Sequence, residues 1–207
     1  MRLLIAVPAM DFMPVAFVKS LTDLITRLKD DQINFELKIE SGTMVHVARD
    51  RLACYAINKE FTDVLWLDSD MVFTPDILED LMFSGKDFVT GIAHSRRPPF
   101  SGCLFKDLRL NSLERFHEYP VDTFEIAGCG FAAVLIKTDV LKAVQMHFNT
   151  CFLPMANYGE DLAFCKRATE LGYKIYAEPG VRLGHVGHIT IYPEDAAKWW
   201  KELEPPC

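Results

Sequence analysis

Short apolar runs alternate along the chain with stretches in which apolar residues recur at steps of three and four. The runs have the length of strands, whereas the periodic stretches have the spacing of one helix face. Strands are predicted near residues 2–7, 35–39, 64–67, 87–92, 131–136 and 173–177. Helices are predicted near residues 18–28, 47–59, 138–146 and 160–171, with further helix starts at Thr74 and Pro193. This alternation predicts one α/β domain over residues 1–207, with a mostly parallel central sheet flanked by helices.

Local signals predict where several helices begin and end. Thr74 stands before Pro75, so a hydroxyl N-cap is expected to precede a proline at the first helical position. Thr138 is expected to cap the next helix, and Gly172 to end the one that begins near Glu160. Residues 101–118 show no clear period, which leaves irregular strands or a mobile loop as alternatives.

The apolar run 64–67 ends abruptly in Asp68-Ser69-Asp70. If the strand continued, its period of two would point both aspartates to one side, with Ser69 opposite. Two like charges at the end of a buried strand repel each other, and a divalent cation would offset that cost because hard oxygen ligands suit Mg²⁺ or Mn²⁺. The alternative is two solvated aspartates in a turn.

Composition narrows the class of protein. Apolar residues make up 50% of the chain and charged residues 25%, which is ordinary for a globular domain. A net charge of −7 disfavours a nucleic-acid partner. No stretch approaches the roughly 18 apolar residues that span a bilayer, and Pro8 interrupts the N-terminal run before a signal-peptide core develops. A cytoplasmic location with reduced, unpaired cysteines is therefore expected.

Several candidate residues fall at the ends of predicted strands. Pro8 follows the first strand, Ser41 follows the second, and Asp68 follows the third. In open parallel sheets, ligands bind at the carboxyl ends of the strands. One shared cleft at that edge is therefore predicted.

Taken in order, the motifs resemble those of nucleotide-sugar-dependent glycosyltransferases of the GT-A fold, most closely the family-2-like members. The segments that carry the resemblance are 5–9 (IAVPA), 47–51 (VARDR), 65–71 (LWLDSDM), 128–131 (GCGF), 159–165 (GEDLAFC) and 184–187 (GHVG). The resemblance covers nearly the whole chain. It implies a single GT-A domain and a hexosyltransferase-like enzyme.

The resemblance implies that the D-x-D acids hold Mn²⁺ or Mg²⁺, which bridges the diphosphate of the donor. Asp70 is expected to coordinate the metal directly, and Asp68 to reach it through water or to contact the ribose. His185 is the predicted third ligand because it lies between two glycines, with His188 as a nearby competitor. A structural or exposed histidine is the alternative.

The resemblance also implies that Asp161 is the base that takes a proton from the acceptor hydroxyl, with Glu160 orienting the acceptor or the donor sugar. This assignment favours inversion, although retaining GT-A enzymes share the D-x-D motif and the late histidine. The structural alternative is that both acids stabilise the first turn of a helix through its dipole.

Donor contacts are expected at the strand ends and next to the central acids. The residues assigned to this role are Pro8, Ala9, Met10, Ser41, Arg49, Asp68, Ser69 and Asp70. The donor is expected to be a UDP- or GDP-linked sugar, and the identity of the nucleotide base is left open because no clear acid follows the second strand. The alternative interpretation of Arg49 is an exposed arginine on the surface of a helix.

The roles of Arg96 and Arg97 stay open between phosphate binding and a solvated basic loop. Trp199 and Trp200 are expected to pack on the domain, with a dimer contact or a peripheral membrane contact as alternatives.

The leading hypothesis is sugar transfer to a glycan or another hydroxyl acceptor. A nucleotidyltransferase is disfavoured because no glycine-rich phosphate loop follows the first strand. A non-catalytic metal- or sugar-nucleotide-binding module is the remaining alternative. The oligomeric state is left open.

Overall fold

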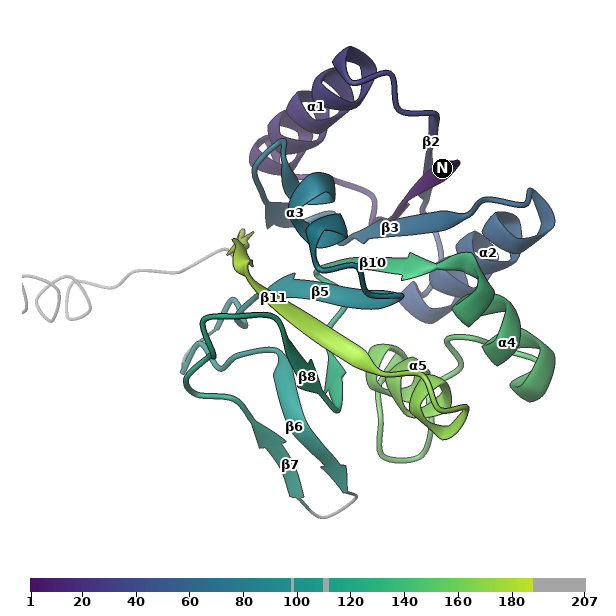
Figure 1. The fold of residues 1–207 in the computed structure, drawn as a ribbon, viewed down its shortest axis with the longest axis vertical. Helices are drawn as coiled ribbons and strands as arrows, with labels where there is room; N and C mark the ends of the chain where they lie inside the picture. Colours follow the sequence, from purple (N-terminus) through teal and green to yellow (C-terminus); the bar gives the residue numbers. More distant parts are fainter. Residues whose placement is uncertain (98, 110–111, 188–207) are drawn as a thin grey trace, which may run out of the picture.

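A computed structural model describes residues 1–97, 99–109 and 112–187. Its centre is a seven-stranded sheet (Figure 1). The strand order is β2 (Phe35–Glu40), β1 (Leu3–Pro8), β3 (Asp63–Leu67), β10 (Ala133–Lys137), β5 (Phe88–Ile92), β11 (Ile175–Arg182) and β8 (Phe124–Ile126). Strands β10 and β8 run antiparallel to their neighbours, and the other five run in one direction. The mostly parallel sheet is therefore confirmed.

Within the described residues, five helices cover the two faces of this sheet (Figure 1). They are α1 (Val15–Asp30), α2 (Val45–Asn58), α3 (Ile77–Phe83), α4 (Thr138–Phe148) and α5 (Glu160–Glu170). The apolar sides of α1 and α3 pack into one core cluster, and those of α2, α4 and α5 into another. The central strands are buried on both faces, so their sequences are continuous apolar runs. The predicted α/β domain flanked by helices is confirmed.

An aromatic cluster fills the core between the sheet and the α2, α4 and α5 side. Trp66 of β3 lies edge-on to Phe131 and Phe152, with ring centroids at 5.9 and 5.1 Å. Phe152 also stacks on Phe164 of α5 at 4.8 Å. These contacts fix α5, whose first turn carries Glu160, against the central strand.

Asp50 of α2 anchors the loop that leads toward α5. Its carboxylate accepts hydrogen bonds from the Thr150 hydroxyl at 2.8 Å and from the backbone N–H groups of Cys151 and Phe152 at 2.9 and 2.8 Å. Buried backbone donors need an acceptor, and this one aspartate satisfies two of them. The loop is therefore held to α2.

Two smaller sheets lie beside the main one. The strands β6 (Leu104–Arg109), β7 (Ser112–Arg115) and β9 (Gly128–Cys129) form one of them, so residues 101–118 contain the irregular strands that were one of the two expectations. The other pairs β4 (Met71–Val72) with β12 (Gly184–His185).

Two predicted helix N-caps are wrong. The predicted N-cap at Thr74 fails because Pro75 and Asp76 form a turn, closed by the Ile77 N–H to Thr74 carbonyl bond at 3.3 Å, and α3 begins at Ile77. Thr138 is the first helical residue rather than the cap, and its buried hydroxyl has no hydrogen-bond partner among the described residues.

The end of α5 and the state of the cysteines agree with the sequence analysis. Gly172 follows α5 with φ of +87°, as a C-terminal glycine should. The five cysteines in the described part of the chain are all unpaired. The predicted terminal helix, His188, Trp199 and Trp200 lie outside the described residues. Within those residues, none of the helices combines the length and apolar composition that crossing a bilayer requires.

Candidate functional site

The candidate site lies at the carboxyl edge of β1, β2 and β3. Because these strands are parallel, Pro8, Ser41 and Asp68 follow or end their strands at the same edge. The Ala9 N–H donates to the carbonyl of Glu40 at 2.9 Å, so the ends of β1 and β2 remain joined there. The shared edge predicted from the strand ends is present.

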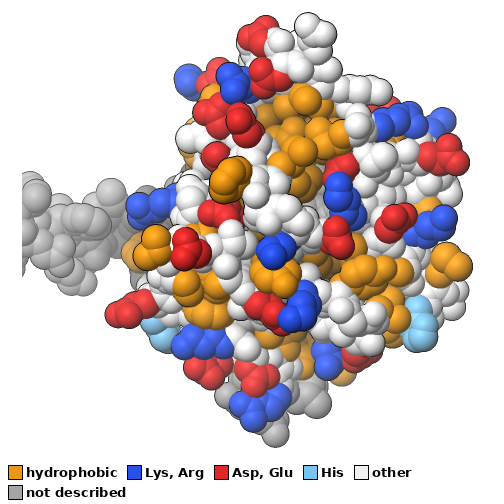
Figure 2. Space-filling view, viewed as in Figure 1, with side chains coloured by type: hydrophobic (Ala, Val, Ile, Leu, Met, Phe, Trp, Pro, Cys, Tyr) orange, Lys and Arg blue, Asp and Glu red, His pale blue; other side chains and the backbone are white. Residues whose placement is uncertain are grey.

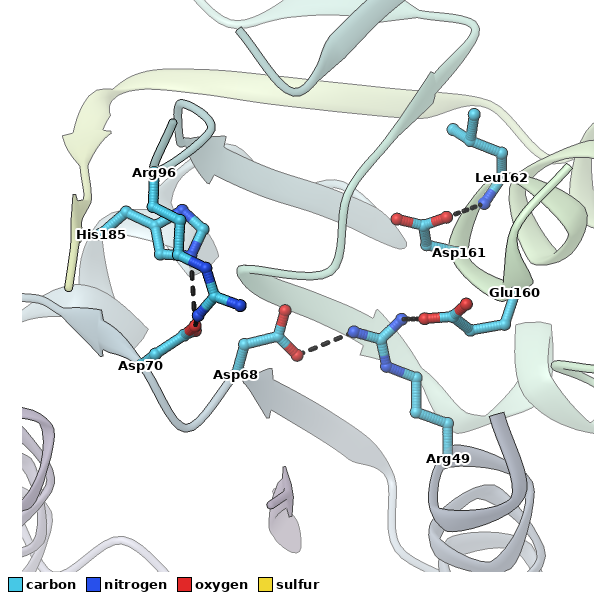
Figure 3. A network of polar contacts seen from close by, with 8 residues as sticks. All are labelled: Arg49, Asp68, Asp70, Arg96, Glu160, Asp161, Leu162 and His185. Atoms are coloured by element: carbon cyan, nitrogen blue, oxygen red, sulfur yellow. Dashed lines mark hydrogen bonds and ion pairs between the residues drawn. The ribbon is translucent and has the colours of Figure 1, made fainter. Parts of the chain in front are cut away.

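The D-x-D acids do not continue the strand. Strand β3 ends at Leu67, and Asp68, Ser69 and Asp70 form a turn in which the Met71 N–H reaches the Asp68 carbonyl at 3.2 Å. The strand-period argument for their orientation is therefore wrong. Figure 3 shows the two carboxylates turned toward different partners.

Arg49 joins Asp68 to Glu160. From α2, its guanidinium lies 2.7 Å from a carboxylate oxygen of Asp68 and 3.0 Å from one of Glu160 (Figure 3). Its side chain is only 4% exposed and lies over the ring of Phe131, 5.0 Å from the centroid. The alternative of an exposed helix arginine is wrong. Glu160 lies in the first turn of α5, as the helix-dipole alternative requires, and its carboxylate also forms this internal ion pair.

Asp70 meets His185 across the short β4–β12 ladder. Met71 pairs with His185, and the Val186 N–H donates to the Asp70 carbonyl at 2.8 Å. The imidazole Nε2 of His185 then lies 3.2 Å from Oδ2 of Asp70. The sequence-predicted pair is therefore brought together by backbone pairing of segments far apart in the chain.

The other ring nitrogen of His185 fixes its tautomer. Nδ1 lies 2.8 Å from the carbonyl oxygen of His94, which can only accept, so Nδ1 carries the proton. In the neutral ring, the lone pair of Nε2 then faces the carboxylate of Asp70. Two acceptors that face each other suit a cation between them.

Arg96 is the second partner of Asp70. Its guanidinium lies 2.5 Å from the same Oδ2 that faces His185 (Figure 3). Neither this contact nor the anchoring role of Asp50 was found from the sequence, because each joins distant segments and no spacing signals it.

Asp161 lies in the first turn of α5. One carboxylate oxygen accepts the backbone N–H of Leu162 at 2.7 Å. Burial raises the pKa of Asp161 above that of an ordinary aspartate, and the charges of Glu160 and Asp68 raise it further, whereas Arg49 opposes the shift. Burial likewise raises the pKa of Asp68, against the lowering effect of Arg49. These carboxyl groups therefore take up protons more readily than solvated ones.

Gly130 forms a wall beside Asp161. A Cβ atom at this position would lie 3.6 Å from the second carboxylate oxygen of Asp161 and 3.5 Å from Cβ of Cys103. The side-chain-free backbone therefore leaves space next to the carboxylate. Burial raises the pKa of Cys103, which keeps this thiol protonated beside the site.

The remaining predicted donor residues take no part in the polar network described above. Pro8 is buried, Ala9 is 9% exposed and Met10 is 81% exposed. Ser41 is exposed and Ser69 is partly buried. They lie along the same sheet edge, and their role in binding the nucleotide-sugar donor stays a prediction.

The residues present suit a cation whose remaining ligands would come from the donor. Across the described ranges, no cluster of three or more His, Cys, Asp and Glu side chains could hold a metal by itself. Asp70 and His185 nevertheless converge on one point. Mg²⁺ characteristically uses one or two carboxylates and takes its remaining ligands from water and substrate phosphates. A two-residue site fits that pattern.

Sequence comparison with known proteins gives evidence that is independent of the geometry. No family model matches the sequence. The chain is 25% identical to the mannan polymerase complex subunit MNN9 of Candida albicans, over 78% of this chain and 54% of the relative. It therefore spans about half the length of that relative.

Two solved structures share the fold. A197 from STIV is 20% identical, with a TM-score of 0.64 over 91% of this chain and 87% of the other. The catalytic domain of Drosophila beta1,4galactosyltransferase 7, solved with xylobiose, is 10% identical, with a TM-score of 0.54 over 99% and 82%. The predicted resemblance to GT-A glycosyltransferases is thus confirmed at the level of the fold.

Proposed function

We propose that this chain is a metal-dependent glycosyltransferase that moves a sugar from a nucleoside-diphosphate donor to an acceptor hydroxyl. Its similarity to glycosyltransferases supports a transferase enzyme. The observation that carries the proposal is that the Asp70–His185 pair and the partly buried carboxylate of Asp161 lie around one polar network, with Asp68 and Arg49 between them (Figure 3).

In this proposal Asp70 and His185 hold Mn²⁺ or Mg²⁺. A cation held by these two residues would supply positive charge next to the leaving diphosphate, where negative charge develops. Asp68 contacts the ribose or a metal-bound water, and Arg49 keeps its carboxylate in place through the 2.7 Å ion pair. The segments that end at Pro8, Met10 and Ser41 line the nucleotide side, with a UDP- or GDP-linked sugar as donor.

Asp161 acts as the base. The acceptor oxygen forms a bond to the anomeric carbon, the bond from that carbon to the diphosphate oxygen breaks, and the hydroxyl proton passes to the Asp161 carboxylate. A single displacement of this kind inverts the anomeric centre. Because the pKa of Asp161 is raised, the acid limb of the pH–rate profile should lie above the range of a solvated aspartate.

Binding is tested first, in a thermal-shift screen of UDP, GDP and their sugar conjugates with and without Mn²⁺. A ligand that binds only the folded state stabilises it by about 2.7 kcal/mol at a hundredfold excess over Kd. We expect a Mn²⁺-dependent shift that Asp70→Asn removes. A shift that Asp70→Asn leaves intact would refute the assignment of the metal ligands.

Turnover is tested next, by release of nucleoside diphosphate from each donor that binds. Wild-type protein should release it in the presence of Mn²⁺, and Asp161→Asn should bind donor normally without turnover. Binding without turnover by the wild type would instead indicate the non-catalytic module. A cytoplasmic location is a further part of this proposal and is checked by fractionation.

A further inference from the structure

The Asp70 carboxylate already has a cationic partner in this structure. The Arg96 guanidinium lies 2.5 Å from Oδ2, and His185 Nε2 lies 3.2 Å from that same oxygen. We infer that Arg96 holds Asp70 while no donor is bound and moves to the donor diphosphate when cation and donor arrive together. This inference rests on the proposed function and adds a residue to it.

The cation and the Arg96 guanidinium compete for one oxygen atom of Asp70. A divalent cation on Oδ2 would stand beside the guanidinium that already donates to that atom, and the two positive charges repel each other. The Asp70 side chain is 24% exposed, so solvent screens this repulsion only in part. A cation held jointly by His185 and Oδ2 of Asp70 therefore requires Arg96 to leave that oxygen.

The structure gives Arg96 freedom to leave. Its side chain is 49% exposed, about twice as much as that of Asp70. Backbone hydrogen bonds hold the chain on both sides of it, from the Ser95 N–H to the Ser101 carbonyl and from the Phe100 N–H to the Arg97 carbonyl, both at 2.9 Å. The main chain is thus held while the side chain can rotate.

A cavity provides room for that rotation. It has a volume of about 300 Å³ and is lined by residues that include His94, Ser95, Arg96, Phe100 and His185. The guanidinium can therefore release Asp70 and stay within reach of any diphosphate bound beside it.

The released guanidinium has an anion to pair with. Arginine donates two parallel hydrogen bonds to phosphate oxygens, which is stronger than a single contact. Before donor binding Arg96 neutralises Asp70, and after donor binding it neutralises part of the diphosphate. Arg96 therefore opposes the cation when it arrives alone and favours the cation–diphosphate pair.

Opposite changes in two affinities test this inference. Mn²⁺ is titrated into wild type, Arg96→Ala and Arg97→Ala, and free Mn²⁺ is measured by electron paramagnetic resonance, first alone and then with UDP or GDP. We expect Arg96→Ala to bind Mn²⁺ alone about fivefold more tightly and to bind the diphosphate with Mn²⁺ about tenfold more weakly. Arg97→Ala is the matched control, since Arg97 is exposed and forms no ion pair within the described part of the chain.

The outcomes separate the two proposals. Equal Mn²⁺ affinity in wild type and Arg96→Ala, or equal changes in both variants, overturns the role of Arg96 and leaves the metal site standing. If the wild type binds no Mn²⁺ even with nucleoside diphosphate, the proposed metal-dependent function fails, and this inference fails with it. Far-ultraviolet circular dichroism checks that each variant is folded.

Discussion

The guanidinium of Arg49 lies 2.7 Å from the carboxylate of Asp68, although one residue comes from a helix and the other from the turn after the central strand. The same arginine reaches Glu160, which is 111 positions further along the chain. One buried side chain thus links the D-x-D turn to the helix that carries the proposed base. The site depends on this residue for its geometry.

Replacing Arg49 should destabilise the fold. Arg49→Met leaves Asp68 and Glu160 without their shared cation, and removing one partner from a buried ion pair costs about 3–5 kcal/mol. Both acids keep some contact with solvent, so the loss should fall near the lower limit. Urea unfolding measures it.

Arg51→Met is the control on the same helix. Its ion pair with Glu40 is 2.9 Å long but its side chain is 59% exposed, so the loss should be about 0–1 kcal/mol. Equal losses in both variants would show that the buried network contributes nothing beyond a surface pair.

Asp161→Asn should stabilise the protein at neutral pH. Because burial raises the pKa of Asp161 in the folded state, ionising it costs more there than in the unfolded chain. Stability of the wild type should therefore rise as pH falls through the folded pKa, until the unfolded aspartate is protonated as well. The gain from Asp161→Asn should be largest at neutral pH and vanish below about pH 4.

Asp139→Asn is the matched control for this measurement. Asp139 is the second residue of α4, as Asp161 is of α5, but it is exposed. It should lose only the helix-dipole interaction, about 0.3–1 kcal/mol. Thermal unfolding over a pH series gives both values, and a gain from Asp139→Asn that matches the gain from Asp161→Asn would contradict the burial argument.

Asp50→Ala should loosen the loop that precedes α5. It removes the acceptor of the Thr150 hydroxyl and of the Cys151 and Phe152 N–H groups. Unsatisfied buried donors cost about 1–3 kcal/mol, which urea unfolding detects. Asp23→Ala, which breaks only an exposed pair with Lys19, should cost about 0.5 kcal/mol or less.

Two glycines should respond differently to alanine. In Gly91→Ala the new methyl group would lie 2.6 Å from Cγ1 of Val181, and overpacking of this kind costs about 1–3 kcal/mol. In Gly130→Ala the methyl group has ordinary contact distances, so stability should change by about 0.5 kcal/mol or less.

The effect of Gly130→Ala should instead appear in transfer. Its methyl group would fill the space beside the Asp161 carboxylate that the proposed acceptor needs. A slower transfer rate at unchanged melting temperature is expected. Full activity in Gly130→Ala would mean that the acceptor lies elsewhere.

The fold could be predicted from the sequence because a strand that is buried on both faces of the sheet consists almost entirely of apolar residues. Strands β1 and β3 are continuous apolar runs, and their ends located Pro8 and Asp68 at the functional edge. Local pattern could not decide whether Arg49 was exposed, because its burial depends on acids contributed by two other segments. Nor could it show that the hydroxyl of Thr138 turns into the core instead of capping its helix.

The short ladder between β4 and β12 also makes the proposed cation site depend on long-range pairing. His185 lies 115 positions after Asp70 and reaches it only because His185 aligns with Met71 across the two strands. Arg96 reaches the same carboxylate from the loop after β5, without any contribution from β12. A chain cut before Gly184 would therefore keep the arginine partner of Asp70 and lose the imidazole.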